Sequence, residues 1–346
     1  MNGKVAVIVV TYNHAAYIGE CILSVRRQSW KDLDLLIVDN GSSDDTVRQT
    51  RALGAQVIEP GENTGYAGGN NIGAEHAEAA GADFLLFLNP DTICHERMVE
   101  EMVRTLSKDD RTAVVQAKVM LMRERDLINT DGIIVNFLYF SYCGGYRKKD
   151  IGGGDREIAV GSGSCLMVRR GAAKAFGGLF KPDFFMYHED TDLCIRARLM
   201  GKRCMLSEGA VVWHDYRFHG SGRKFFHMEK NRLFLLAQNY KAVTLAALLP
   251  AILFTEMQVL GYSVMKGWFI NKAASYVWLI KNLCFVRDNR KAVQSRRVVE
   301  DWRLMENFCG EISFEEISNP ALKYIANPVL NAYFAVLRPV LKAFSI

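Results

Sequence analysis

The sequence lacks the short motifs that mark several large nucleotide-binding and metal-binding classes. Its eight cysteines include no C-x-x-C pair, which argues against a zinc knuckle or a disulfide scaffold and favours reduced thiols in a cytosolic setting. The glycines of 65–73 do not fit G-x-G-x-x-G, and no G-x-x-x-x-G-K-[ST] loop occurs. A dinucleotide-binding fingerprint and a P-loop NTPase are therefore both disfavoured.

Long apolar runs are also missing. The C-terminal third contains an uncharged run of 14 residues, 242–255, which includes Pro250 and ends at Glu256. A bilayer-spanning helix needs about 20 apolar residues, so this run predicts a buried or interfacial helix. The chain enters an apolar stretch as early as Val5, which leaves no room for a signal peptide and predicts a protein that stays on the cytoplasmic side.

Charge of either sign is nearly balanced over most of the chain. Residues 1–240 hold 30 Lys/Arg and 30 Asp/Glu, whereas 241–346 hold 13 and 8, so the last third carries the whole net charge of +5. This excess is too small for a nucleic-acid footprint, so no nucleic-acid partner is expected. It suits a surface that faces anionic lipid.

The C-terminal segment 329–346 has the pattern of an amphipathic helix with a basic polar stripe. Its apolar face would carry Leu330, Tyr333, Phe334, Leu337, Val340, Leu341 and Phe344, and its polar face Asn331, Arg338, Lys342 and Ser345. Such a helix can lie on a membrane surface. The alternative is a helix that packs on the catalytic domain or on a second subunit.

The first 120 residues alternate between strand and helix patterns. The whole sequence has 346 residues, of which 49% are apolar, so it is long enough to form one large core or two domains. Ser43 or Asp44 can cap the second helix. Repeated βα units predict an α/β fold with a doubly wound, mainly parallel sheet. Strands are expected at 5–10, 33–38, 56–59 and 84–88, and helices up to about 25, over 46–53 and from about 74 to 80.

Polar clusters follow the predicted strands, at 11–13, 39–44, 63–70 and 89–92. The carboxyl ends of parallel strands meet at one edge of a sheet, where α/β proteins bind ligands. The clusters therefore predict a nucleotide crevice. For any single cluster, turn and cap residues remain an equal alternative, because Asn, Asp, Ser and Gly favour turns for conformational reasons.

Two acidic motifs lie about a hundred residues apart. The first is the apolar run 84–88 followed by Asn89-Pro90-Asp91, and the second is 184–193, which places three acids in four positions. A carboxylate at Asp91 can hold a metal on a phosphate, and one near 190 can take a proton. Together they favour group transfer from a phosphorylated donor.

Five of these motifs, in this order and spacing, resemble the inverting family-two glycosyltransferases of GT-A fold, particularly their rhamnosyltransferase-like branch. They are Val9–Asn13, Asp39–Asp44, Asn63–Asn70, Asn89–Asp91 and Tyr187–Leu193. Gly161–Arg170, Phe176–Gly178 and Trp213-His214 also look like that branch. The resemblance covers roughly residues 4–240. It implies a catalytic domain over 1–240 that binds nucleotide-sugar and acceptor, followed by a helical, basic, membrane-surface region over 241–346.

For the donor site, the resemblance implies that Asp39 binds the nucleobase. A carboxylate accepts the imide N–H of uracil or thymine, which fits a dTDP or UDP sugar. Thr11 and Asn13 would line the base and the ribose. Asn40, Asn63 and Gly65 would lie close to the nucleotide.

For the metal, the family's D-x-D motif corresponds to Asn89-Pro90-Asp91, with Asn in place of the first acid. Asp91 is the expected ligand of Mg²⁺ or Mn²⁺, and Asn89 would bind ribose or diphosphate. His214 is the expected second ligand, unless it merely satisfies a backbone carbonyl. His219 and His227 match nothing in the family and are expected in a loop or on a helix surface.

For catalysis, the resemblance places the base second in a Glu-Asp pair, which is Asp190 here. Glu189 would orient the acceptor or a neighbouring side chain. Asp192 precedes a helical pattern and is expected to cap it.

Together these features predict a metal-dependent inverting glycosyltransferase on the cytoplasmic face of the cell membrane, bound peripherally. It would transfer a sugar, with dTDP-rhamnose as leading donor, to a glycan or polyprenyl-diphosphate-linked acceptor in cell-surface polysaccharide synthesis. A sugar nucleotidyltransferase would share the nucleotide-binding sheet but would release pyrophosphate and would not need Asp190. A catalytically silent sugar-binding scaffold is the third possibility, and the presence of both Asp91 and Asp190 argues against it.

Overall fold

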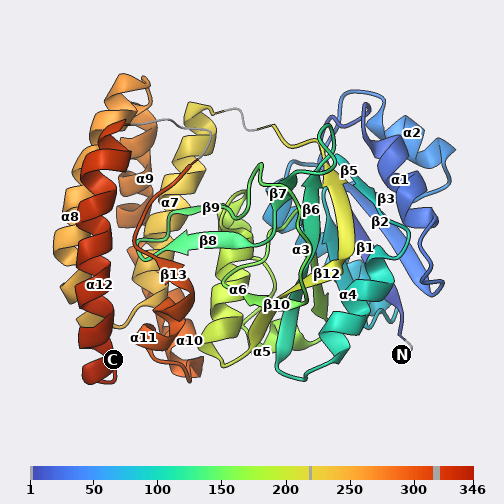
Figure 1. The fold of residues 1–346 in the computed structure, drawn as a ribbon. Coiled ribbons are helices and arrows are strands. Elements are labelled where there is room, and N and C mark those ends of the chain that lie inside the picture. Colours follow the sequence, from blue (N-terminus) through green and yellow to red (C-terminus); the bar gives the residue numbers. More distant parts are fainter. Residues whose placement is uncertain (1–2, 218–219, 315–319) are drawn as a thin grey trace.

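The computed structural model describes residues 3–217, 220–314 and 320–346, and its N-terminal half is built on parallel strands. Their spatial order is β3-β2-β1-β4, all parallel, which confirms the βα pattern (Figure 1). These strands and their helices are β1 (Val5–Thr11), α1 (Ile18–Arg26), β2 (Leu33–Asp39), α2 (Thr46–Ala52), β3 (Gln56–Ile58), α3 (Gly65–Ala79) and β4 (Phe84–Leu88).

The other half of this ten-stranded sheet is mixed. Strand β11 runs antiparallel to both of its neighbours, β4 and β6, and β12 is parallel to β6. Two short strands attach to it: β7 pairs with β6, and β5 pairs with the end of β12. The bounds are β5 (Thr92–Cys94), β6 (Thr112–Leu121), β7 (Ile128–Thr130), β10 (Arg156–Ile158), β11 (Cys165–Arg169) and β12 (Arg203–His214).

Helices cover both faces of the sheet, as a doubly wound fold requires. Alternate residues of β1 point to opposite faces, so Ala6 and Ile8 join the core under α3 while Val7 and Val9 join a second core under α1 and α4 (Met98–Ser107). The predicted α/β class is confirmed. The antiparallel strands are the part that the repeated βα units did not indicate.

Helix α3 begins earlier than the sequence suggested. The glycine-rich stretch 65–73 belongs to the helix and not to a loop before it. A Cβ atom on Gly73 would lie 2.4 Å from Ile8 Cγ2, so glycine allows the helix to approach β1 closely. Glycine inside a helix costs about 1 kcal/mol relative to alanine, and the close packing on the sheet offsets that cost.

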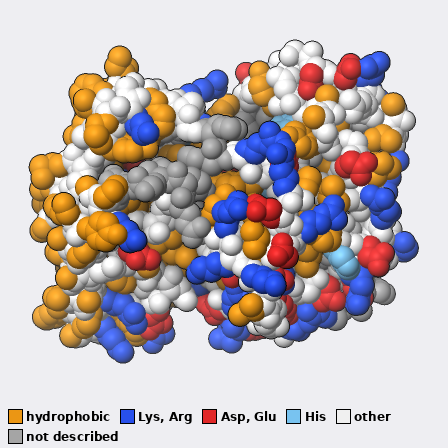
Figure 2. Space-filling view, turned by 45° about the horizontal axis from the view of Figure 1, so that its top comes forward, with side chains coloured by type: hydrophobic (Ala, Val, Ile, Leu, Met, Phe, Trp, Pro, Cys, Tyr) orange, Lys and Arg blue, Asp and Glu red, His pale blue; other side chains and the backbone are white. Residues whose placement is uncertain are grey.

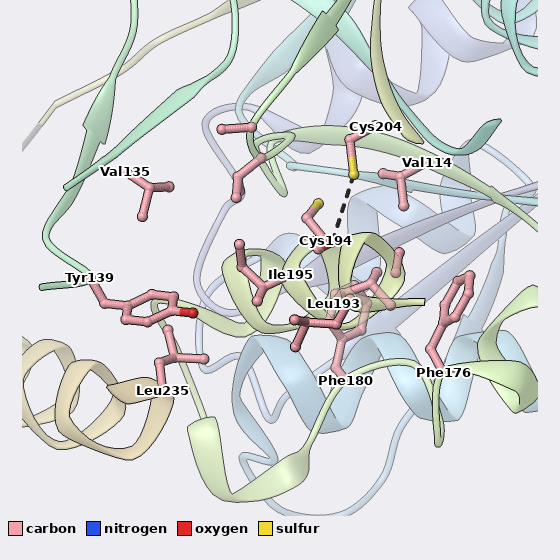
Figure 3. Close-up of a cluster of buried hydrophobic side chains, with 14 of the residues drawn as sticks. Val114, Val135, Tyr139, Phe176, Phe180, Leu193, Cys194, Ile195, Cys204 and Leu235 are labelled. Carbon is pink, nitrogen blue, oxygen red and sulfur yellow. Dashed lines mark hydrogen bonds between the residues drawn. The ribbon is translucent and has the colours of Figure 1, made fainter. Parts of the chain in front are cut away.

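Helix α6 (Glu189–Leu199) carries the second acidic motif and is anchored in the larger core. Its side chains Leu193, Cys194 and Ile195 are fully buried (Figure 3). Figure 3 also shows the Cys204 thiol of β12 donating to the carbonyl oxygen of Cys194, at 3.8 Å. Because a packed helix has few alternative positions, the acids at its N-terminus are held in place relative to the sheet.

The C-terminal part forms a block of helices beside the sheet (Figure 1). It is tied to the rest of the chain by a small second sheet, in which β13 (Phe308–Cys309) pairs with β8 (Ile133–Asn136), and β8 pairs with β9 (Ser141–Cys143). One continuous core contains residues from both sides of position 240. The helices are α7 (Gly222–Asn239), α8 (Ala242–Met265), α9 (Phe269–Lys281), α10 (Leu283–Arg296), α11 (Asp301–Leu304) and α12 (Asn327–Ala343).

Four charged side chains form a buried network that links three of these helices. Arg232 of α7 pairs with Glu229 of the same helix at 2.8 Å and with Glu256 of α8. Lys272 of α9 is completely buried and pairs with Glu229 and, at 2.7 Å, with Glu256. Tyr276 also donates its hydroxyl hydrogen to Glu256. Each buried charge therefore has a partner, which is the condition for tolerating charges in a core.

Helix α8 is longer than the uncharged run 242–255 from which the sequence predicted it. Its 24 residues continue past Glu256, and by length and composition it is the one helix within the described ranges that would be able to cross a membrane. Thr244, Leu248, Ala251 and Thr255 form a buried stripe along it. The rest of its surface is largely exposed, and Glu256 is held by the buried ion pairs.

Helix α12 packs differently from the membrane-surface expectation. Leu330, Leu337 and Leu341 are buried in the protein core, and the Phe334 ring stacks on Phe137 at 5.1 Å. Most of the apolar face predicted to meet lipid therefore covers the protein itself, as in the alternative of packing on the catalytic domain, while Val340 and Phe344 stay exposed. The cause is the neighbouring aromatic surface around Phe137, which the local sequence pattern could not reveal.

Candidate active site

The loops after β1 and β2 are bound to each other by short polar side chains. The Asp39 carboxylate accepts hydrogen bonds from the backbone N–H of Gly41 at 3.1 Å, the backbone N–H of Ser42 at 2.8 Å and the Ser42 hydroxyl at 2.5 Å. Asn13, in a left-handed conformation, accepts the Ser43 N–H at 2.8 Å. Asp39 is buried, so it fixes the shape of its own loop at the carboxyl edge of the sheet.

Asn40 joins the loop after β2 to the loop before α3. Its side-chain oxygen accepts from the Thr64 N–H at 3.2 Å, and its amide nitrogen donates to the Gly65 carbonyl at 3.0 Å. Asn63 accepts the Gly65 N–H at 3.0 Å, which closes a tight turn. Gly65 has a φ of +72°, and a Cβ there would lie 2.5 Å from the Phe185 carbonyl oxygen, so this position requires glycine.

The start of α2 is held by the same cluster of loops. Asp45 occupies the position before the helix, but the neighbouring Asp44 carboxylate accepts the N–H of Thr46 at 3.0 Å. Asp44 therefore satisfies a free helix donor, as one of the two predicted capping residues. The Thr46 hydroxyl accepts the His14 N–H at 2.8 Å, which ties the helix to the loop after β1.

Asp91 and His214 face each other because of strand pairing. Strand β5 pairs with β12 so that Thr92 lies opposite His214, which places Asp91 beside the imidazole. Asp91 Oδ1 lies 3.2 Å from His214 Nε2, and His214 is buried. Burial alone would raise the pKa of Asp91, but the adjacent His214, with a contribution from His14, lowers the pKa below its ordinary value.

The other imidazole nitrogen shows what this pair is able to bind. His214 Nδ1 lies 2.9 Å from the side-chain oxygen of Asn129, which is an acceptor, so Nδ1 carries the hydrogen. Nε2 then presents a lone pair towards the Asp91 oxygen. Two acceptors at 3.2 Å need a proton or a cation between them, and adjacent ligand atoms of an octahedral metal with bonds of about 2.1 Å lie about 3 Å apart.

A carboxylate oxygen and a neutral imidazole nitrogen therefore fit a divalent cation such as Mg²⁺ or Mn²⁺. Asn129 would orient the histidine, as outer partners of metal ligands commonly do. In the described part of the chain, no cluster of three or more His, Cys, Asp or Glu side chains supplies a complete ligand set. The remaining ligands would come from a bound diphosphate and from water, which suits hard cations of this kind.

Asn89 lies at the end of β4, next to this pair. Its backbone N–H donates to the Ser164 carbonyl at 3.0 Å, and its carbonyl accepts the Thr92 hydroxyl at 2.6 Å. Thr11 is buried at the end of β1, with its hydroxyl 3.3 Å from His14 Nδ1. The structure thus brings both residues to the same edge as Asp91.

Sequence reasoning missed His14. Its Nδ1 accepts the Tyr12 N–H at 3.1 Å, which leaves the hydrogen on Nε2, and burial lowers the pKa of His14 despite the nearby Asp91, Asp44 and Asp39 charges. A neutral imidazole donor therefore lies at the carboxyl edge of β1. The signal was available, because His14 directly follows the Thr11–Asn13 motif.

Asp215 was also missed, although it directly follows His214. Its backbone N–H donates to the Asp91 carbonyl at 3.0 Å. Its buried carboxylate accepts from Tyr17 at 2.8 Å, Arg123 at 3.0 Å and Arg217 at 3.0 Å. Both guanidinium groups are about half exposed or more, so Asp215 holds two accessible cations beside the Asp91–His214 pair.

Asp190 and Glu189 lie at the N-terminus of α6. Asp190 accepts the Gly163 N–H at 3.0 Å and the Thr191 N–H at 2.6 Å, while the inner oxygen of Glu189 has no partner among the described residues. Burial raises the pKa of Asp190. Burial, followed by the Asp190 charge, raises the pKa of Glu189 well above its ordinary value. Since Asn89 bonds to Ser164 and Asp190 to Gly163, one loop connects the two acidic motifs.

Asp192 does not cap the helix as expected. His188 occupies the cap position, and the fully buried Asp192 carboxylate binds Arg196 at 2.7 Å and the Gln238 amide at 2.7 Å. Asp192 lies within the first turn, where its side chain points into the core and cannot reach the free N–H groups. It joins α6 to α7 instead.

The segment before α6 is conformationally strained. Phe185, Tyr187 and His188 all have positive φ angles, of 62°, 65° and 65°. Such conformations cost about 1–3 kcal/mol each and persist where the surroundings impose them, often at functional sites. His227 stacks on the Phe185 ring at 5.1 Å, so it is partly buried rather than on the helix surface. His219 lies outside the described residues.

Comparison with known proteins agrees with this geometry. A family model described as glycosyl transferase family 2 matches residues 6–177. The N-acetylglucosaminyl-diphospho-decaprenol L-rhamnosyltransferase of Mycobacterium tuberculosis is 25% identical over 64% of this chain and 79% of its own length. The O-antigen chain rhamnosyltransferase WbaN of Salmonella anatum is 24% identical over 75% of this chain and 89% of its own length.

Solved structures share the fold at low sequence identity. A mannosyltransferase from Pyrobaculum calidifontis, in complex with GDP-Man and Mn²⁺, has a TM-score of 0.52 and 18% identity, covering 82% of this chain and 88% of that chain. Residues 1–349 of S. aureus TarS, in complex with UDP, have a TM-score of 0.54 and 16% identity, covering 98% and 91%. The fold is therefore that of the GT-A glycosyltransferases.

Proposed function

Because this chain belongs to glycosyltransferase family 2, in its rhamnosyltransferase-like branch, we propose that it is a metal-dependent inverting rhamnosyltransferase of cell-surface polysaccharide synthesis. The donor is dTDP-rhamnose and the acceptor is a polyprenyl-diphosphate-linked glycan. Support for this acceptor comes from the mycobacterial relative, which is an N-acetylglucosaminyl-diphospho-decaprenol L-rhamnosyltransferase. One observation carries the proposal most directly: Asp91 faces His214, and Asn89 of the same motif and Asp190 bond to adjacent residues of one loop, Ser164 and Gly163.

Asp91 and His214 hold the divalent cation, with Asn129 fixing the histidine tautomer. The bound cation supplies positive charge that stabilises the departing nucleoside diphosphate. Arg123 and Arg217, held by Asp215, add positive charge on the same side. Asn89 positions the ribose or the diphosphate.

Asp190 acts as the general base. The acceptor hydroxyl gives its proton to Asp190 while its oxygen forms a bond to the anomeric carbon, and the bond from that carbon to the diphosphate oxygen breaks with inversion. The raised pKa of Asp190 suits this role, because proton transfer is most effective when the pKa of the base approaches the working pH. Glu189 orients the acceptor from the adjacent buried position.

Asp39 reads the nucleobase through the free lone pairs of its carboxylate, which the loop N–H groups hold in place. Thr11 and Asn13 line the base and ribose. Asn40, Asn63 and Gly65 shape the loops around the nucleotide and hold them together. Residues 1–240 thus form the catalytic region, and 241–346 the helical region.

The helical region holds the protein on the cytoplasmic face of a membrane without crossing it. Of the 22 exposed large apolar side chains in the described ranges, 18 lie beyond residue 240, and Figure 2 shows hydrophobic side chains gathered on the outer side of the helical block. Such a concentration marks an interaction surface. Glu256 favours surface binding over a span through α8, because it is held by Arg232 and Lys272 of the neighbouring helices.

A donor screen tests this function. Purified protein is incubated with Mn²⁺, a lipid-linked acceptor and each nucleotide sugar in turn, and free nucleoside diphosphate is measured. Release from dTDP-rhamnose supports the proposal. Formation of a nucleotide sugar and pyrophosphate from a nucleoside triphosphate and a sugar 1-phosphate would instead establish the nucleotidyltransferase. Sugar binding without turnover of any donor would establish the silent scaffold.

A further inference from the structure

An apolar cavity of about 920 Å³ lies between the strained loop before α6 and the helical block. This volume is at the upper end of the range of about 300–1,000 Å³ that is typical of ligand sites. The walls come from α7, α8, the short π-helical segment Leu322–Ala326 and the residues around Phe140. Its apolar lining includes Phe225, Phe254, Val259, Tyr262, Trp268 and Phe314.

The cavity begins directly beside the acidic pair of α6. His188 lines it and is the residue before Glu189. In the same loop, the Phe185 carbonyl accepts the Ala67 N–H at 3.2 Å from the start of α3, on the donor side. A molecule that lies in the cavity and reaches past His188 would therefore arrive at Glu189 and Asp190.

Two buried polar groups in the cavity wall have no partner among the described residues. They are His188 Nδ1 and the Thr255 hydroxyl, on side chains that are 8% and 3% exposed. Burying a polar group without a hydrogen bond is costly, and such groups are commonly satisfied by water or a ligand. They indicate that the occupant carries polar atoms.

Two cations in the wall also have no ion-pair partner in the described part of the chain. Lys224 of α7 and Lys266, just after α8, both line the cavity, and across the described ranges no carboxylate lies within ion-pair distance of either. The other charged groups of the wall, Glu229 and Arg232, already pair with each other. The site therefore offers a long apolar surface together with positive charge that has no counter-ion among the described residues.

We propose that this cavity binds the isoprenoid chain of a polyprenyl-diphosphate-linked acceptor, with Lys224 and Lys266 at its diphosphate and the first sugar passing His188 towards Asp190. This proposal rests on the proposed function, because it locates the acceptor of the same reaction. The exposed apolar surface of α8 and α9 lies next to the cavity and allows a long chain to continue into the membrane. The catalytic residues would then act on a sugar close to the membrane surface.

Gly261 provides the test variant. It lines the cavity from α8, its φ angle is not positive, and a Cβ added there meets nothing within 4 Å. The substitution Gly261→Trp therefore fills the cavity, while the loss of a helical glycine does not weaken the helix. Met257→Trp is the matched control, because Met257 lies one turn earlier on the same helix, is 67% exposed and is not part of the wall.

Farnesyl diphosphate serves as the probe, and calorimetry on the full chain without sugar nucleotide measures its binding. The wild type and Met257→Trp should bind it equally, and Gly261→Trp should bind at least about tenfold more weakly, since excluding two or three methylene groups has this effect. The double variant Lys224→Gln/Lys266→Gln should lose about tenfold for farnesyl diphosphate and nothing for farnesol. Equal binding by the wild type and Gly261→Trp, or full competition by inorganic diphosphate, would overturn the proposal.

A transfer assay separates this inference from the proposed function. With a polyprenyl-linked acceptor, Gly261→Trp should raise the acceptor KM at least about tenfold, and with a lipid-free acceptor its KM should match that of Met257→Trp. If the wild type uses both acceptors with the same KM, the cavity proposal fails while the transferase activity stands. If farnesyl diphosphate binds as expected but no nucleotide sugar is turned over, the proposed function fails and the lipid site stands.

Discussion

Replacing Lys272 with methionine should destabilise the protein strongly, because it removes a buried counter-charge. Lys272 is completely buried on α9 and serves both Glu229 and Glu256, whose side chains are 5% and 13% exposed. In Lys272→Met, Arg232 alone faces two carboxylates. Breaking a buried ion pair on one side typically costs about 3–5 kcal/mol, and the remaining arginine places our expectation at about 3 kcal/mol.

The pH dependence gives this prediction a second test. In the wild type, burial acts to raise the pKa of Glu229, but the Arg232 and Lys272 charges prevail and lower it to about 2. A lowered carboxyl pKa adds stability that is present above the unfolded value of about 4.5 and is lost as the pH falls towards 2. The Lys272→Met variant loses part of this contribution. The difference in the free energy of unfolding between the wild type and the variant should therefore shrink from pH 7 towards pH 3.

Urea unfolding followed by circular dichroism at several pH values measures both effects. Lys281→Met, on the exposed face of the same helix, is the control and should change the free energy of unfolding by less than about 0.5 kcal/mol. The reasoning would be refuted if Lys272→Met lowered the free energy of unfolding by less than about 1 kcal/mol at pH 7. It would also be refuted if the difference in this free energy between wild type and variant grew on acidification. Either result would mean that the network does not hold α7, α8 and α9 together.

Three further predictions concern the site and the surface. Asp190→Asn should lower kcat by about 10²–10⁴-fold with unchanged donor affinity, whereas the exposed Asp183→Asn should behave as wild type. Because the pKa of Asp190 is raised, kcat of the wild type should increase with pH, with a midpoint above the usual pKa of an aspartate. A midpoint below that value would contradict the assignment. Asp91→Ala should abolish the strengthening of dTDP binding by Mn²⁺ in calorimetry, and persistence of that strengthening would place the metal elsewhere. Full-length protein should sediment with anionic vesicles, and Ile270→Asp/Ile280→Asp should release it, whereas Ile151→Asp, whose residue is 93% exposed on the other side of position 240, should not. Equal sedimentation of all three would argue against the helical block as the membrane-binding surface.

The parallel half of the fold was predictable because its signals are local. The apolar runs at Val5, Leu33 and Phe84 need only burial on both faces to become strands, and each was predicted within one residue of its observed bounds. The start of α3 was not, because glycine normally argues against helix. Only the approach of Gly73 to Ile8 shows why the helix accepts it, and that contact depends on the sheet.

In the candidate site, too, local motifs predicted some features, whereas others depend on contacts between distant parts of the chain. The family resemblance named Asp91, His214 and Asp190 from their motifs, but not the tautomer of His214, which depends on Asn129 from a different strand. Asp192 was misassigned for a related reason. A carboxylate near a helix start predicts a cap, and only the buried Arg196 and Gln238 show that this one points inward.

The exposed apolar surface of the helical block shows why an amphipathic pattern alone does not identify the partner of a helix. The leucines of α12 have the spacing expected for lipid contact, yet they pack on the protein, while the exposed apolar side chains lie mainly on α8, α9 and the outer side of α12. Deleting α12 would therefore expose the core as well as remove part of this apolar surface. Since α8 contributes both this exposed surface and a wall of the cavity beside His188, a lipid held there would reach Asp190 without leaving the membrane. The proposed transfer to a membrane-embedded acceptor requires such an arrangement, which depends on the largely buried Glu256 keeping α8 against α7 and α9.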